Sequence, residues 1–304
     1  MSLKNNKTAF AIWALMTLAL PVVAQDDLMK MLDEETTDKN KTEYATATFK
    51  TTRLINGHSI ENVASGVLDF RISHRFGFVS TGAYELWGLD NASMRMGFDY
   101  GLTKRLMIGV GRSTYQKQFD GFAKYKVLRQ SSGARNMPLS LSVVGTVMYK
   151  SLKFDDPSRT NYQSSNFYYC GQIIFARKFT EGLSLQLMPT VVHYNLVPVA
   201  GDPNDLFSVG AGGRFKLSKR VSVNVEYYYQ LPANQFAGTY NSLSVGFDVE
   251  TGGHVFQLYM TNSTGMTERT FISETTGDFF KGDIRLGFTI SRVFTLRKPR
   301  IDQE

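Results

Sequence analysis

Hydrophobic side chains recur at every second position over long stretches of this chain. In residues 68–76, Leu68, Phe70 and Ile72 fall on one face, and the residues between them are polar or charged. Successive side chains of a β-strand point to opposite faces, so each such stretch predicts a strand with one apolar and one polar face. The pattern recurs in residues 94–100, 106–110, 139–149, 183–191, 207–215, 221–229, 243–249 and 284–290.

Alternation of this kind is typical both of a soluble β-sandwich and of a membrane β-barrel. The polar faces favour the barrel, because their glycines, serines and charges suit a wet or ion-paired lumen while the apolar faces suit lipid. The charges expected to line the lumen are Asp69, Arg71, Arg75, Arg95, Asp99, Lys124, Lys126, Arg214, Glu226, Asp248, Asp283 and Arg285. Two interpretations of them stay open: ion pairs that fill the interior, or a narrow polar conduit.

The connections between the expected strands alternate in length. Short turns fall near residues 103, 181, 219 and 252, and long polar loops lie between them, the last at residues 263–281. In single-chain outer-membrane barrels the strand number is even, periplasmic turns are short and outer loops are long. We therefore predict an all-β, antiparallel transmembrane barrel of about twelve strands over residues 66–294, with both of its ends on the periplasmic side.

Composition agrees with a barrel and excludes other classes. The mean hydropathy of −0.20 is too low for several membrane helices of ~20 apolar residues each. The net charge of +7 is spread along the chain, so no nucleic-acid partner is expected. The single cysteine, Cys170, and four scattered histidines lack the spacing of metal ligands, so no cofactor and no metal site are expected.

The two ends of the chain carry other signals. Lys4 and Lys7 precede an apolar run that Pro21 ends, and small residues lead up to Ala24, so residues 1–24 read as a cleaved signal peptide. Residues 25–65 are expected to form a periplasmic leader, and residues 295–304 a periplasmic tail. Residues 47–55 also alternate, which leaves open an extra strand or a segment tucked into the lumen.

Four stretches resemble a known family: residues 47–59, 66–71, 89–92 and 122–130. Over most of residues 44–296 the chain is similar to bacterial β-barrel proteins grouped as a domain of unknown function. The resemblance implies the barrel fold and an outer-membrane location. It brings no catalytic or ligand-binding residue with it.

No sequence motif assigns a chemical activity, and we do not expect an enzyme. A structural role, or one in assembly or interaction, is favoured over a small-solute, porin-like channel. A barrel lipid hydrolase is the third hypothesis; it needs a serine beside an outward histidine such as His193, and the sequence offers no matching serine. The expected partners are outer-membrane lipids, the barrel-assembly machinery, and a periplasmic or outer-membrane protein.

Overall fold

The computed structural model describes residues 41–154, 158 and 160–297. The chain divides into two units. One contains the two-stranded antiparallel sheet of β1 (Thr42–Tyr44) and β6 (Ser131–Gly133), and the other comprises Ala45–Gln130 and the residues from Met137 onward. The predicted signal peptide, the first part of the leader and residues 298–304 lie outside the described residues. No helix of the described part has the length and apolarity to span a membrane.

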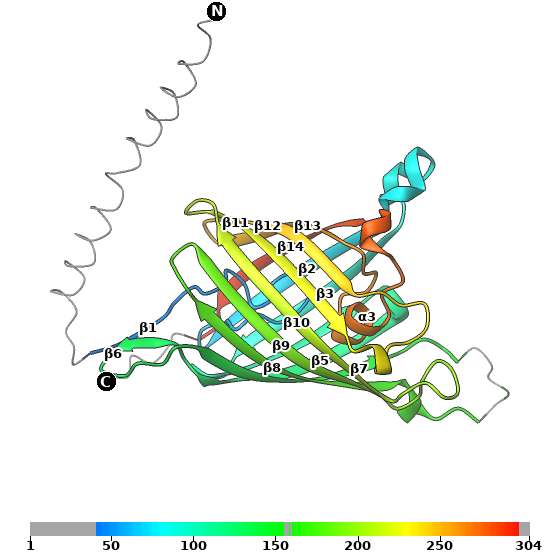
Figure 1. Cartoon of the computed structure of the whole chain (residues 1–304), viewed down its shortest axis with the longest axis horizontal. Coiled ribbons are helices and arrows are strands. Elements are labelled where there is room, and N and C mark those ends of the chain that lie inside the picture. Colours follow the sequence, from blue (N-terminus) through cyan, green and yellow to red (C-terminus); the bar gives the residue numbers. More distant parts are fainter. Residues whose placement is uncertain (1–40, 155–157, 159, 298–304) are drawn as a thin grey trace, which may run out of the picture. The chain divides into compact units, whose positions relative to one another are not determined.

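The second unit is a closed barrel of twelve antiparallel strands, as predicted (Figure 1). Each strand pairs with its neighbours along the chain, and the last strand pairs with the first to close the ring. The strands are β2 (Val67–Phe78), β3 (Ala92–Gly101), β4 (Leu106–Ser113), β5 (Gln118–Leu128), β7 (Ser140–Lys150), β8 (Phe167–Lys178), β9 (Leu183–Tyr194), β10 (Asp205–Lys216), β11 (Val221–Gln230), β12 (Ser242–Thr251), β13 (His254–Thr261) and β14 (Arg285–Thr295).

Alternating side chains point outward and inward along every strand. In β4, Ile108 and Val110 are exposed on the outer wall, whereas Met107 between them is fully buried inside. The outer wall carries the apolar residues that the sequence placed there, so the predicted register is confirmed. Closure leaves no free strand edge, which is the condition for a sheet to cross lipid.

The two ends of the barrel differ. At one end, here the turn end, short connections join the strands, as at residues 102–105 and 217–220. At the other, the loop end, the connections are longer and include η1 (Val79–Gly88), η2 (Tyr115–Lys117), η3 (Gln163–Asn166) and η4 (Pro232–Asn234). The strands β2 and β14 begin and end, respectively, at the turn end.

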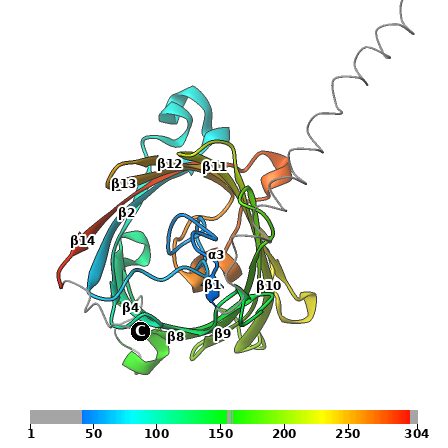
Figure 2. The ribbon, with the colours of Figure 1, turned by 90° about the vertical axis from the view of Figure 1, so that its left-hand side faces the viewer.

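Two segments of the chain fold into the ring of strands (Figure 2). Residues 45–66, the N-terminal plug, lie inside next to β2, and every residue from Thr51 to Ile60 is buried. Residues 262–284, the loop plug, connect β13 to β14; α3 (Glu268–Ser273) lies inside the ring, whereas η5 (Phe279–Lys281) lies at its loop end, where Phe280 is 86% exposed. All six residues of α3 are buried.

The structure corrects two expectations and decides between the alternatives that the sequence left open for residues 47–55. Residues 263–281 are not simply an outer loop, because α3 places Phe271 and Ile272 in the lumen, where neither is exposed to solvent. Asp283 does not lie on the last strand, because β14 begins at Arg285 and pairs with β2 through an irregular register just after it. Residues 47–55 form no strand and lie in the lumen, so this part of the chain is not a free leader.

A charge on the outer wall tests whether this wall faces lipid. Val110 is 60% exposed on β4. We predict that Val110→Arg lowers the free energy of unfolding by about 2–4 kcal/mol, because an arginine in hydrocarbon is poorly solvated. Urea titration of the protein folded in lipid vesicles measures this. Tyr84→Arg in the loop after β2, where the side chain is 95% exposed, is the control and should change little; equal stability of both variants would contradict a lipid-facing wall.

Candidate functional site

The N-terminal plug is a tight hairpin. The backbone N–H of Leu54 donates to the carbonyl of Gly57 at 2.9 Å, and that of Ser59 donates to the carbonyl of Thr52 at 3.0 Å. Residues 56–58, whose Asn-Gly-His sequence is typical of a turn, form its tip. Gly57 is required there, because a Cβ at this position would lie 1.9 Å from the hydroxyl oxygen of Tyr228 on β11.

Glu226 on β11 holds the tip of the hairpin. The backbone N–H groups of Ile55, Asn56 and Gly57 all donate to its carboxylate, over 3.1–3.2 Å. Three successive N–H groups turned toward one point form an anion-binding concavity, and here a carboxylate of the wall fills it. Glu226 is 1% exposed, so this contact satisfies a buried charge and three buried donors at once.

Other side chains of the wall bind the backbone of the same plug. Lys124 on β5 donates to the carbonyl oxygens of Ser59, at 3.0 Å, and of Glu61. Further contacts of this kind come from β9, β10 and β13, where Gln186 donates to His58 O, Arg214 to Ala47 O and Gln257 to Leu54 O over 2.8–2.9 Å. The plug is therefore fastened to strands on several sides of the ring.

The loop plug is held by a second set of contacts. Thr267 and Thr270 form a reciprocal capping box that begins α3. Arg269 of α3 lies with its guanidinium carbon 4.1 Å from the centre of the Tyr168 ring and donates to Glu274 at 2.6 Å. The opposite face of the helix packs Phe271 against Tyr228, with ring centres 5.1 Å apart.

The two plugs meet in the middle of the lumen. Arg53 of the N-terminal plug donates to Glu268 of the loop plug at 2.6 Å, and both side chains are almost fully buried. His58 lies 3.4 Å from the same carboxylate oxygen. Burial, together with the cations Arg53 and Lys124, lowers the pKa of His58 well below its usual value, so the ring is neutral at pH 7 and adds no ion pair.

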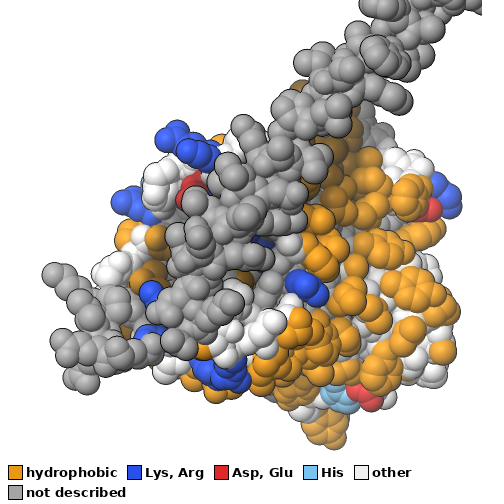
Figure 3. Space-filling view, turned by 60° about the vertical axis from the view of Figure 1, so that its left-hand side comes forward, with side chains coloured by type: hydrophobic (Ala, Val, Ile, Leu, Met, Phe, Trp, Pro, Cys, Tyr) orange, Lys and Arg blue, Asp and Glu red, His pale blue; other side chains and the backbone are white. Residues whose placement is uncertain are grey.

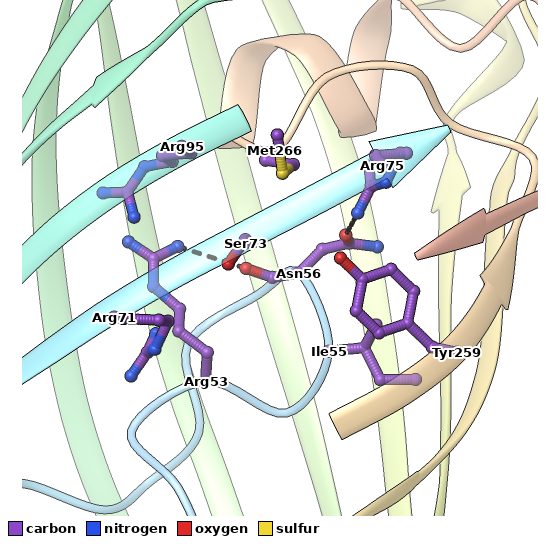
Figure 4. Close-up of a pocket in the computed structure, with 9 residues that line it drawn as sticks. All are labelled: Arg53, Ile55, Asn56, Arg71, Ser73, Arg75, Arg95, Tyr259 and Met266. Carbon is purple, nitrogen blue, oxygen red and sulfur yellow. Dashed lines mark hydrogen bonds between the residues drawn. The ribbon is translucent and has the colours of Figure 1, made fainter. Parts of the chain in front are cut away.

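A small cavity lies between the N-terminal plug and the wall. This cavity, beside Asn56, has a volume of about 10 Å³ and holds about one water molecule; Figure 4 shows the residues that line it. Its polar lining includes the guanidinium groups of Arg53, Arg71, Arg75 and Arg95. Among the described residues, the Nε atoms of the first three have no hydrogen-bond partner, so they are donors available to such a water. A continuous aqueous path does not pass through a space of this size.

The predicted lumen charges divide into two groups. Nine are almost fully buried inside the ring: Asp69, Arg71, Arg75, Arg95, Asp99, Lys124, Arg214, Glu226 and Asp248. The other three are only half-buried and lie near its two mouths. Lys126 faces Glu61 at 3.8 Å at the turn end, Arg285 lies 3.6 Å over the Phe78 ring at the loop end, and Asp283 accepts from the backbone N–H of Asp278.

Ion pairs organise part of the buried group. Arg71 contacts both Asp69, at 3.0 Å, and Asp99, at 3.4 Å. Arg95 forms two hydrogen bonds with Asp120, one of them 2.9 Å from Nε to Oδ1. Arg75 instead donates to neutral groups, among them Asn56 and Ser263 of the two plugs. These wall charges thus bind either other residues of the wall or residues of the plugs.

The sequence interpretation missed the plug residues Arg53, Glu268 and Arg269, and also Asp120 on β5. Two signals pointed to the loop plug: the Thr267–Thr270 capping pattern, and the adjacent Phe271 and Ile272 within an otherwise polar loop. No comparable signal identifies Arg53, whose partner lies 215 positions away.

Gly57 provides a steric test of the hairpin. We predict that Gly57→Ala destabilises the folded protein by about 1–3 kcal/mol, because the added methyl group overlaps the Tyr228 hydroxyl. The double variant Gly57→Ala/Tyr228→Phe should recover part of this loss, because the nearest remaining ring atom is then 3.0 Å away. Urea unfolding in vesicles measures both effects. Wild-type stability of the single variant would show that the hairpin tip is not packed against β11.

Glu226 provides an electrostatic test. Glu226→Gln removes the charge that three N–H groups share, and hydrogen bonds to a charged group contribute about 1.5–3 kcal/mol each. We predict a destabilisation of about 2 kcal/mol and faster hydrogen exchange at the amides of residues 55–57. The control Glu250→Gln removes a rim carboxylate paired with Lys50 and should cost less than about 1 kcal/mol. Similar exchange in both variants would argue against the role of Glu226.

Several solved structures have a similar fold. The NanC porin is 9% identical, with a TM-score of 0.48 over 74% of this chain and 98% of that one. The KdgM porin is 11% identical, with a TM-score of 0.44 over 75% and 99% of the two chains. An outer membrane channel from Pseudomonas putida F1 is 12% identical, with a TM-score of 0.47 over 77% and 98%. No property of these proteins is transferred to this chain.

A search of curated proteins found no match. A family model does match, over residues 49–294, which include nearly all of the N-terminal plug, the loop plug and the barrel. This range agrees with the stretches on which the sequence resemblance rests. The chain therefore belongs to the family described as "Membrane bound beta barrel domain (DUF5777)".

Proposed function

We propose that this protein is a sealed outer-membrane barrel with a structural or interaction role, and that it does not conduct solutes. The observation that carries the proposal is the contact between the two plugs. Arg53 and Glu268 join segments that come from opposite ends of the lumen, and the cavity beside them holds about one water molecule.

The way the plugs are held supports a permanent seal. A loosely inserted segment would leave buried polar groups without partners, at a free-energy cost of about 1–3 kcal/mol for each. Here Glu226 and Lys124 each bind several backbone groups of the hairpin, and Arg75 binds both plugs. Withdrawal of the hairpin breaks all of these contacts together.

In this proposal residues 1–24 direct secretion across the inner membrane and are removed, and the turn end faces the periplasm. The assembly machinery for barrels and the lipids of the outer membrane are then the first partners of the chain. The interaction role includes a protein partner in the periplasm or the outer membrane. This partner binds the exposed connections between strands rather than the lumen.

The hydrolase hypothesis receives little support from the outer wall. His193 Nδ1 lies 2.8 Å from Asp205 Oδ1, which resembles the histidine–carboxylate half of a triad. The other neighbour of the imidazole is the Tyr169 ring, and the described residues give it no serine partner. To act as a hydrolase, this pair would still need a nucleophile. The function that we propose is therefore not enzymatic.

Electrical recording tests the seal. We predict that the wild-type protein, folded and inserted into planar bilayers, gives no reproducible conductance steps, because the plugs occupy the lumen. A porin inserted under the same conditions is the positive control, and the heat-dependent shift of the barrel on a gel verifies folding. Regular steps from the wild-type protein would overturn the proposal.

A gated small-solute channel is the second candidate, and one observation favours it. Both ends of the N-terminal plug lie at the turn end, where the N–H of Ala45 donates to Gln130 O and that of Gly66 to Gly101 O. The hairpin is therefore able to leave on one side without opening a strand pair. If the channel hypothesis holds, Arg53→Ala/Glu268→Ala raises the frequency of opening, whereas the exposed outer-wall pair His193→Ala/Asp205→Ala does not.

A further inference from the structure

The turn end of the barrel is strongly basic. Among the described residues of the barrel unit at this end, the exposed or half-buried acidic side chains are Glu61, Glu181 and Glu250, and each is already paired with a lysine, namely Lys126, Lys178 and Lys50. Further exposed or half-buried basic residues form what we call the basic rim: Lys104, Arg105, Arg129, Arg177, Lys216, Lys219, Arg220, Arg292 and Arg297. These nine basic residues outnumber the described carboxylates of the barrel unit at this end.

The loop end has no such excess. Its described basic side chains are Arg112, Lys117, Lys150, Lys153, Lys281 and Arg285, and its acidic ones are Glu85, Asp90, Asp202, Asp205, Glu274, Asp278 and Asp283. The two sets nearly cancel. The basic character is therefore specific to one end of the barrel and does not simply follow from the net charge of the chain.

The basic rim forms a ring rather than a patch. Its residues come from the turn between β3 and β4, the ends of β5 and β8, the turn between β10 and β11, and the end of β14. In the closed order of strands these positions are distributed around the circumference. Figure 3 shows Lys and Arg side chains at this end next to the apolar wall. A bound peptide would meet only part of such a ring, whereas a lipid leaflet surrounds all of it.

Two arginines of the rim have a geometry suited to the membrane boundary. The guanidinium of Arg177 lies 5.0 Å from the ring centre of Phe179, and that of Arg292 lies 5.0 Å from the ring centre of Phe294. Both rings are exposed on the outer wall. An aromatic ring at the boundary positions the cation above the hydrocarbon, where a planar guanidinium is able to bind a phosphate with two hydrogen bonds.

We propose that the basic rim binds the phosphate groups of anionic phospholipids in the leaflet at the turn end, with Arg177 and Arg292 as its principal contacts. The inference rests on the proposed membrane location, but not on the seal of the lumen. Basic groups beside an apolar anchor are what anionic lipid surfaces attract, and the attraction is screened by salt. A ring of them favours an annulus of anionic lipid over zwitterionic lipid.

Native mass spectrometry of the full chain tests this proposal. The protein in detergent is offered equal amounts of phosphatidylglycerol and phosphatidylethanolamine, and the lipids that remain bound are counted. We expect the wild-type protein to retain phosphatidylglycerol preferentially. In Arg177→Gln/Arg292→Gln this preference should fall about fivefold for each arginine removed, and added salt should weaken it in the wild-type protein.

The matched control is Arg112→Gln/Lys117→Gln at the loop end. Arg112 also lies over a ring, 5.3 Å from the centre of Phe119, so this variant removes two charges and one cation–ring contact without touching the rim. It should keep the wild-type lipid preference. Equal retention of both lipids by the wild-type protein, or an equal loss of preference in both variants, would overturn the proposal.

Carbodiimide cross-linking of the wild-type protein in vesicles separates lipid from a protein occupant. A zero-length cross-link from Lys104 or Lys219 to the carboxylates of residues 26–38 would show that the acidic leader covers the rim, and would overturn the proposal. Absence of such links, with the lipid preference present, supports it. If the wild-type protein conducts in planar bilayers but still retains phosphatidylglycerol preferentially, the proposed seal is refuted and this inference is unaffected.

Discussion

A barrel that closes in lipid turns all of its inward side chains toward a confined space, and whatever polar groups it carries there must find partners inside. In this protein the wall contributes buried charges from β2, β3, β5, β10, β11 and β12, and a ring of twelve strands is too wide for them all to pair across it. The plugs resolve this problem. Their backbones supply N–H and carbonyl groups at the points where Glu226 and Lys124 would otherwise be buried alone.

The same constraint makes the plugs part of the fold rather than an addition to it. The hairpin reaches strands on several sides of the lumen, and α3 packs its apolar residues against aromatic side chains of the wall. Arg53 of the N-terminal plug and Glu268 of the loop plug then form an ion pair, so each plug supplies the partner of a buried charge on the other. Such mutual dependence explains how a polar lumen is filled by polar segments of the chain.

The outside of the barrel follows different physics. Its middle is apolar and needs only lipid, whereas its two ends meet head groups and water, where charge matters. The loop end is balanced and the turn end is basic among the described residues, although both belong to the same twelve strands. The plugs in the lumen and the asymmetric rim are independent features, and the second directs the search for a partner toward the membrane surface and the connections between strands.

The sequence by itself determined the barrel, because the alternation of side chains along each strand and the lengths of the connections are local properties. In Leu68, Asp69 and Phe70, for example, three successive residues are enough to show which side chains share a face of the strand. It also identified most of the wall charges that lie inside. Only the tertiary structure decided that the lumen is filled, because that depends on contacts such as Glu226 with Asn56, 170 positions apart, and Arg53 with Glu268, 215 apart. Alternation specifies which side chains enter the lumen but not which backbone they meet there, since a loop that folds inward and one that folds outward share the same polar composition.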